Sequence, residues 1–279
     1  MATLSTKALV ASADSRAKRS DGVTLVAAFG DQKPDQFIQL LSDLVERCEA
    51  ETRLTGWIRL YPKAQIHATI VGLEGKRHDG SIVQENMSAR LGGVGPGPPM
   101  NFAAFLKFFA SYVFDVPMVV GGFGQDDVNP FDLNAGRNPF QRSFDIRSDG
   151  LLVAMGWPQA VGKFTPYMIG LRKYLETFNV VHKYHVRLQD QDNDLFFVVG
   201  EVDASRWGSA SDSEREIVQE ALNELVTDCQ QHLSGRRYAF SLQTSDLYIV
   251  RYLRTSLEET SFVRPVTQTD VNTLVDLYP

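Results

Sequence analysis

The chain has 279 residues, of which 43% are hydrophobic and 22% charged, and its formal net charge is −6. This composition is typical of a folded globular protein, and the acidic balance argues against a protein that binds long duplex DNA across a basic face. No apolar run approaches the roughly 20 residues that span a bilayer, so we expect no membrane-spanning helix.

The N-terminal segment differs in composition from the rest of the chain. Residues 1–21 are rich in Ala, Ser and Thr, and we expect a flexible, solvated tail, although their basic side chains also resemble an organellar transit peptide. A buried strand at residues 23–29 and an amphipathic helix at residues 33–51 then begin a single domain over residues 22–279. The other elements expected in the first half are strands at residues 57–61 and 67–71 and a helix at residues 102–115.

The second half begins with a strand expected at residues 116–122, and a stretch rich in Gly, Asn, Pro and Asp at residues 125–138 predicts a long surface loop. The sequence Ser148-Asp149-Gly150 predicts the turn of a hairpin. Further expected elements are hairpin strands at residues 144–146 and 151–155, a helix at residues 165–179, strands at residues 184–188, 195–202 and 247–253, and a helix that begins at a capping box formed by Ser211 and Glu214.

Two of the predicted strands carry a histidine followed two positions later by a polar residue. They read Ile66-His67-Ala68-Thr69-Ile70 and Tyr184-His185-Val186-Arg187-Leu188. Because side chains alternate along a strand, His67 and Thr69 are expected to share one face, and His185 is expected to lie beside Arg187 and Lys183. His182 is an odd number of positions from His185 and is expected to face the other way. Two histidines with phosphate-binding neighbours indicate phosphoryl chemistry.

Several segments together resemble the two-histidine (2H) phosphoesterase superfamily, which includes RNA 2′,3′-cyclic phosphodiesterases and enzymes described as 2′-5′ RNA ligases. Residues 59–75, RLYPKAQIHATIVGLEG, resemble the first family motif, and residues 142–157, RSFDIRSDGLLVAMGW, resemble the hairpin before the second. The opening strand at residues 24–29 and the closing strand at residues 246–253 fit the same order. The second motif departs from the family, since Arg187 stands where Ser or Thr is expected.

This resemblance implies an α+β fold that is bilobal and duplicated, with two mostly antiparallel sheets facing a central cleft and helices outside. It implies His67 and His185 as an acid/base pair, with Thr69, Arg187 and Lys183 binding the phosphoryl group and with no metal or cofactor required. The expected partner is a nucleotide or short RNA end that carries a 2′,3′-cyclic or 2′-linked phosphate. Tyr248 and Tyr252, on the closing strand, are candidates for stacking a base.

Two other functions remain open at this point. The chain is also compatible with a binding protein that has lost the chemistry and holds a phosphorylated ligand through Arg187 and Lys183, because arginine is a forked phosphate donor. The other alternative is a protein-interaction module that binds through the loop at residues 125–138. Cys48 and Cys229 form no CxxC pair, so we expect reduced core cysteines and a cytoplasmic location. The pattern specifies no oligomeric state.

Overall fold

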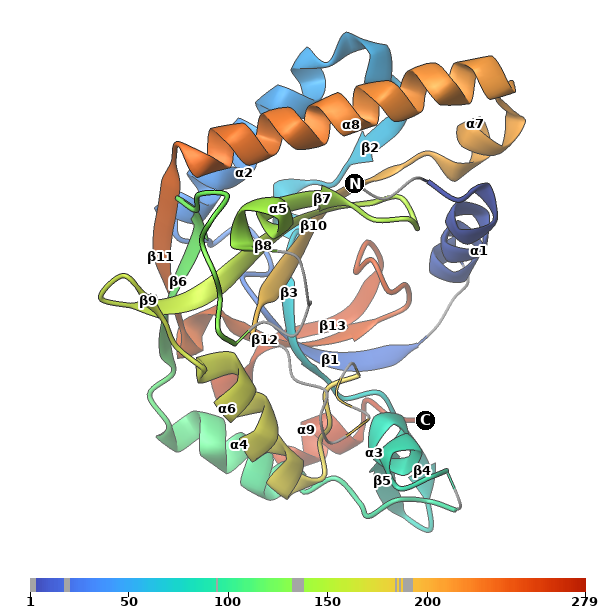
Figure 1. Ribbon diagram of the computed structural model, residues 1–279. Coiled ribbons are helices and arrows are strands. Elements are labelled where there is room, and N and C mark those ends of the chain that lie inside the picture. The colour runs from blue at the N-terminus through green and yellow to red at the C-terminus, as the bar shows by residue number, and fades with distance from the viewer. Residues whose placement is uncertain are drawn as a thin grey trace.

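The computed structural model describes residues 4–17, 21–93, 95–131, 138–183, 185, 187 and 193–279. The chain has a mixed α/β fold with curved antiparallel sheets (Figure 1). The first sheet has the strand order β13 (Thr260–Pro265), β12 (Leu247–Tyr252), β1 (Gly22–Ala27) and β3 (Ala68–Gly72). The opening and closing strands of the sequence are therefore direct neighbours.

The second sheet is built from strands of the middle and late parts of the chain. Its order is β11 (Arg237–Gln243), β6 (Asp115–Gly121), β8 (Leu151–Ala160), β10 (Leu195–Val202) and β2 (Ile58–Leu60). Two short strands, β7 (Phe144–Ile146) and β9 (Lys163–Phe164), pair with β8, and a separate hairpin joins β4 (Gly75–His78) to β5 (Ser81–Gln84). Each pair of neighbouring strands is antiparallel.

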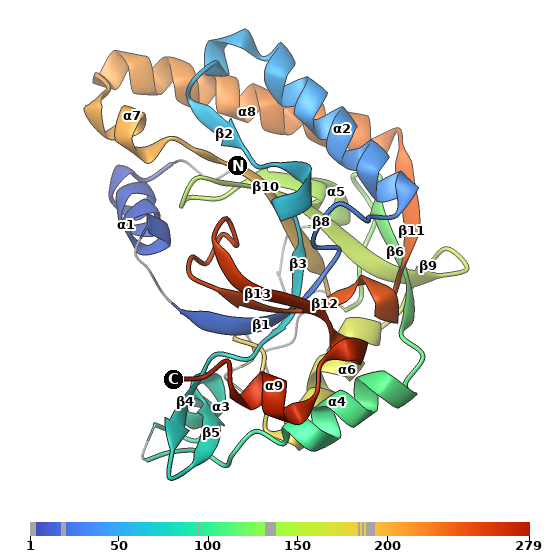
Figure 2. The same ribbon diagram turned by 180° about the vertical axis from the view of Figure 1, so that it is seen from behind.

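Helices cover the two sheets on opposite sides of the molecule. The helices α2 (Asp35–Ala50) and α8 (Asp212–Ser234) lie alongside each other over the second sheet, as both views show (Figures 1 and 2). The helices α4 (Phe102–Ser111), α6 (Tyr167–Leu175) and α9 (Val271–Val275) lie beyond the first sheet. The remaining helices in the described part of the chain are α1 (Thr6–Ala17), α3 (Glu85–Arg90), α5 (Pro139–Ser143) and α7 (Ala204–Ser209), with short 3₁₀ turns between elements.

The main core runs through the whole molecule and includes buried side chains of both sheets and of the helices on either side of them. Phe37 of α2 packs against Phe197 of β10 and Phe240 of β11, with ring centroids 4.5 and 5.1 Å apart. The capping box of α8 is confirmed, because the Ser211 amide donates to Glu214 and the Glu214 amide donates to Ser211 Oγ. These contacts fix the outer layer that supports the second sheet.

The expectation of a flexible tail over residues 1–21 is wrong for most of that segment. Residues Thr6–Ala17 form the helix α1, in which Leu9 is fully buried. Trp207 of α7 donates from Nε1 to Thr6 Oγ1 at 3.0 Å. The helix has no continuous apolar stripe in its sequence, so its stability comes from these tertiary contacts and was not visible as a periodic pattern.

The strand expected at residues 184–188 is also not observed at the positions that the structure describes. His185 and Arg187 lie outside any strand, and Tyr184, Val186 and Leu188 fall outside the described residues. The His185 amide donates to His182 O at 2.8 Å, which closes a turn. Because residues three apart in such a turn lie on one side, the two rings come within 4.9 Å, so the expectation that His182 faces away is wrong.

Other expectations hold with shifted ends. The helix expected at residues 102–115 ends at Ser111, and Asp115 begins β6 instead. Residues 125–131 of the expected long loop contain no helix or strand, and residues 132–137 lie outside the described part of the chain. In the residues that the structure covers, no helix has the length and apolar character needed to cross a membrane.

Candidate functional site

The strand β3 places two of the predicted site residues side by side. Ile66, Ala68 and Ile70 are buried in the main core, whereas His67 and Thr69 are half-buried and point the other way. His67 immediately precedes the first residue of β3. Both side chains line the same cavity, so the expected alternation along this segment is confirmed.

This cavity, with a volume of about 280 Å³, lies where elements of both sheets meet. We call it the His67 cavity. Its lining comes from α1, the end of β2, β3, the turn between β7 and β8, Lys183 ahead of β10, β10 itself, and the loop that follows β12. Segments far apart in the sequence therefore form one small concave site, which is the usual form of a small-ligand site.

The ring of His67 is held in one tautomer. Its Nδ1 lies 2.7 Å from the carbonyl oxygen of Gln65, and since a carbonyl only accepts, Nδ1 carries the proton. The neutral ring then keeps its lone pair on Nε2. Phe29 packs with its ring 6.0 Å from the imidazole in an edge arrangement. The geometry leaves Nε2 as the nitrogen that can accept a proton.

The surroundings of His67 also favour its neutral form. The pKa of His67 is lowered from 6.5 to about 4: burial is the largest cause, the hydrogen bond to Gln65 opposes it, and the charges of Lys33 and Lys183 add smaller decreases. At neutral pH the ring is therefore an uncharged base. This differs from the unperturbed value near 6.5 on which a sequence-based mechanism relies.

Lys33 supports the backbone on which His67 sits. Its Nζ donates to the carbonyl of Ile66 at 2.8 Å and to the carbonyl of Ala28. Burial lowers the pKa of Lys33 to about 8, with the charge of Asp31 acting in the opposite direction. The lysine joins the end of β1 to the residue before His67 and so fixes the entry into β3.

Of the predicted phosphate-binding residues, the structure brings Thr69 and Lys183 to the His67 cavity. Thr69 is half-buried, and Lys183 is exposed and close enough to His67 for its charge to act on the ring. Arg187 is exposed and does not belong to the lining. A hydroxyl and an ammonium group therefore accompany the imidazole.

His185 does not line this cavity. Its side chain is only 2% exposed, its ring packs beside that of His182, and its carbonyl accepts a hydrogen bond from Arg90. Arg90 is in turn paired with Glu176 at 2.5 Å. The structure thus does not bring the two predicted catalytic histidines together in this cavity.

The two tyrosines suggested for base stacking have packing roles. The β-sheet register aligns Thr69 with Val26 and Val26 with Tyr248, so Tyr248 lies one strand beyond β1. Tyr252 is 7% exposed and donates to Glu74 Oε1 at 2.9 Å. Both rings belong to a small apolar cluster, in which Tyr248 is half-buried. Neither tyrosine lines the His67 cavity.

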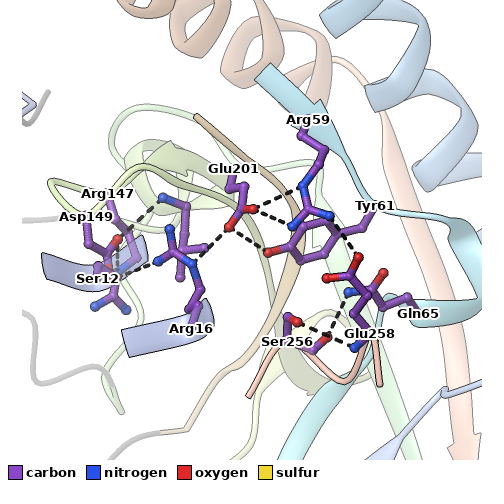
Figure 3. A network of polar contacts seen from close by, with 11 residues as sticks. Ser12, Arg16, Arg59, Tyr61, Gln65, Arg147, Asp149, Glu201, Ser256 and Glu258 are labelled. Carbon is purple, nitrogen blue, oxygen red and sulfur yellow. Dashed lines mark hydrogen bonds and ion pairs between the residues drawn. The ribbon is translucent and has the colours of Figure 1, made fainter. Parts of the chain in front are cut away.

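The sequence reasoning missed two arginines that line the same cavity as His67. Arg16 comes from α1 and Arg147 from the turn between β7 and β8, where it lies 3.4 Å from Asp149 (Figure 3). Arg147 stands inside the segment that carries the family resemblance, which is the signal that would have drawn attention to it. Arg16 had no such signal, because its segment was taken for a tail.

A larger cavity of about 610 Å³ lies on the outside of the molecule between α2 and α8. Its central group is Asp43, which accepts hydrogen bonds from Tyr238 and Arg236 and contacts His232 at 3.3 Å. Burial raises the pKa of Asp43, but these hydrogen bonds and the Arg236 charge lower it overall. Because the charged groups of this cluster satisfy one another, we place the candidate chemistry at the smaller His67 cavity.

Within the part of the chain that the structure describes, no three His, Cys, Asp or Glu side chains are grouped to hold a metal ion. Comparison of the sequence with protein-family models finds no match, and no curated protein matches it. The functional argument therefore depends on the geometry of the His67 cavity and on the motifs of the sequence.

Proposed function

We propose that the His67 cavity is the active site of a phosphodiesterase of the two-histidine type, which hydrolyses a 2′,3′-cyclic phosphate or a related 2′-linked phosphate on a nucleotide or short RNA end. The observation that carries this proposal is the grouping of a neutral imidazole, a hydroxyl and several cations in one small cavity. A phosphodiester requires a base for the attacking water and positive charge near its oxygens.

The fold supports the same proposal. The first sheet contributes His67 and Thr69, and the second sheet contributes β10 and the β7–β8 turn, so two antiparallel sheets meet at the cavity. This arrangement is what a duplicated, two-lobed phosphoesterase fold would require. The motif at residues 59–75 lies across the entry into β3, where that family would carry its first histidine.

In the proposed reaction His67 Nε2 accepts a proton from water, and the water oxygen forms a bond to phosphorus. The bond from phosphorus to the ribose 2′ oxygen, or to the 3′ oxygen, breaks, and the leaving oxygen takes up a proton. Thr69 donates its hydroxyl hydrogen to a phosphoryl oxygen, and Lys183 balances the charge that develops there. The product is a phosphomonoester with one free ribose hydroxyl.

The proton for the leaving oxygen is assigned to His185 in a two-histidine mechanism. In the structure that ring packs beside His182, outside the cavity lining, so this role requires the segment around residue 185 to rearrange when substrate binds. The position of His185 also favours a second candidate function, a binding protein that retains the anionic ligand and lacks turnover. Measurement of turnover distinguishes the two functions.

The test is hydrolysis of the four nucleoside 2′,3′-cyclic phosphates and of a short RNA with a cyclic phosphate end, with a chelator present and products identified by mass spectrometry. His67→Ala is expected to lower kcat by about 100-fold or more, the usual contribution of a general base. His185→Ala reports whether the second histidine takes part.

His78→Ala is the matched control, because His78 is exposed on the β4–β5 hairpin and should leave turnover unchanged. Full turnover in His67→Ala would overturn the proposed active site. Absence of turnover in the unmodified protein, together with binding of the nucleotides, would select the binding protein.

A further inference from the structure

Helix α1 forms one wall of the His67 cavity. Ser12, Ser15 and Arg16 line the cavity from this helix. The helix is anchored by Leu9, which packs against Gly150 in the β7–β8 turn so closely that a Cβ added at Gly150 would lie 3.0 Å from it. A segment that precedes the first strand of the fold is thus part of the cavity.

The guanidinium of Arg16 is fixed by its neighbours, but not all of its hydrogen-bond donors are used. Its Nη1 donates to Ser12 Oγ, and its Nε forms an ion pair with Glu201 Oε2 at 2.9 Å. Its Nη2 is buried, in agreement with the 13% exposure of the whole side chain, and has no hydrogen-bond partner among the residues that the structure describes. A buried cationic donor without an acceptor is costly, so such a group favours an anionic ligand.

Glu201 does not fully occupy Arg16, because the carboxylate is shared. Arg59 approaches Glu201 at 2.5 and 3.1 Å, and the Tyr61 hydroxyl donates to it at 3.0 Å (Figure 3). Arg59 also contacts Glu258 at 3.2 Å. One carboxylate therefore positions two guanidinium groups, of which only that of Arg16 belongs to the His67 cavity.

The charge of the cavity differs from that of the chain. Its lining contains the cations Arg16, Arg147 and Lys183 and one carboxylate, that of Asp149, whereas the whole chain carries a net charge of −6. Arg147 pairs with Asp149 at 3.4 Å, and Lys183 is assigned to the reacting phosphate. Arg16, which shares its partner Glu201 with Arg59, is therefore the cation available to a second anionic group. The cavity, about 280 Å³, is near the lower limit of roughly 300 Å³ for ligand sites, so the additional anion must belong to the same small ligand.

We propose that Arg16 binds a second anionic group, a phosphate, of the nucleotide whose cyclic phosphate lies at His67. This inference rests on the proposed function and names its substrate class, a nucleotide with a terminal phosphate in addition to the reacting one. Helix α1 is then the element that selects the substrate, since it carries the guanidinium that recognises the second phosphate.

The test compares adenosine 2′,3′-cyclic phosphate with the same compound carrying a 5′-phosphate. The unmodified protein is expected to prefer the 5′-phosphorylated compound about tenfold or more in KM, the effect of a charge-assisted hydrogen bond to a buried arginine. Arg16→Gln is expected to abolish this preference. Arg59→Gln is the matched control, because it removes the other arginine from Glu201 and should keep the preference.

Binding of the two compounds to His67→Ala, measured by calorimetry, separates this inference from the proposed function. If the unmodified protein hydrolyses neither compound but binding keeps an Arg16-dependent preference, the reaction is wrong and the second phosphate site stands. Turnover without any preference for the 5′-phosphate overturns the site and leaves the reaction. If Arg16→Gln fails to fold, Arg16→Lys, which keeps the charge but loses the fork, is expected to weaken the preference, and an unchanged preference overturns the site.

Discussion

The proton on His67 Nδ1 decides what this residue can do. The contact with Gln65 O at 2.7 Å directs Nε2 toward acceptor chemistry, and burial with two nearby lysines keeps the ring neutral. The sequence predicted which residues share a face, because alternation along β3 depends only on local geometry. It did not predict the pKa, since Lys33 and Lys183 reach the ring from distant positions in the chain.

We expect the His67 ring to titrate near pH 4 rather than 6.5, as measured by the NMR shifts of its ring protons. The unfolded chain binds this proton more tightly than the folded one, so protonation of His67 favours unfolding. The free energy of unfolding therefore keeps its full value above pH 6.5 and falls as the pH drops from 6.5 to 4. The loss amounts to about 3 kcal/mol at most. Urea unfolding of His67→Gln should show a smaller fall between pH 6.5 and 4, and an equal fall in both proteins would contradict the low pKa.

At the scale of elements, the sequence predicted what depends on local signals. The helix α2 follows from the spacing of Phe37, Leu40, Leu41 and Leu44, all of which are buried. The hairpin of β7 and β8 follows from its Ser-Asp-Gly turn. The helix α1 and the turn from His182 to His185 were missed, because the first depends on contacts with Trp207 and Gly150 and the second has no periodic pattern.

The turn between β8 and β9 contains a locally unfavourable residue. Val161 and Gly162 connect the paired residues Ala160 and Lys163, and both have left-handed φ values, 49° and 74°. A β-branched residue is strained there, whereas asparagine tolerates this conformation. The Val161 side chain is fully exposed, so its replacement removes no packing.

Val161→Asn is therefore expected to raise the free energy of unfolding by about 1 kcal/mol, measured by urea denaturation. Val113→Asn is the control, since Val113 is also exposed (82%) and has no left-handed φ, and it should give no gain. A Val161→Asn protein no more stable than the control would show that the turn is not strained.

At the scale of the whole molecule, the candidate site depends on segments from both ends and the middle of the chain. The lining includes Ser12, His67, Arg147, Lys183 and Ser256, which no local pattern connects. The family-like motifs pointed to His67 and Thr69 correctly as neighbours, and they pointed to His185, which the tertiary structure keeps beside His182. The other lining residues are brought together by long-range packing, in particular by the packing of α1 on the β7–β8 turn.

The contribution of α1 to the whole fold is testable through Leu9. This side chain is fully buried, so Leu9→Ala should lower the free energy of unfolding by about 2–4 kcal/mol and speed hydrogen exchange at the amides of residues 6–17. Val10→Ala is the matched control in the same helix, because Val10 is 37% exposed and should change stability by less than about 0.5 kcal/mol. Since Arg16 depends on the same helix, Leu9→Ala should also weaken the preference for the 5′-phosphorylated nucleotide. Equal exchange rates in the two variants would mean that α1 is held by contacts other than Leu9, and Ser12, Ser15 and Arg16 would then keep their places without it.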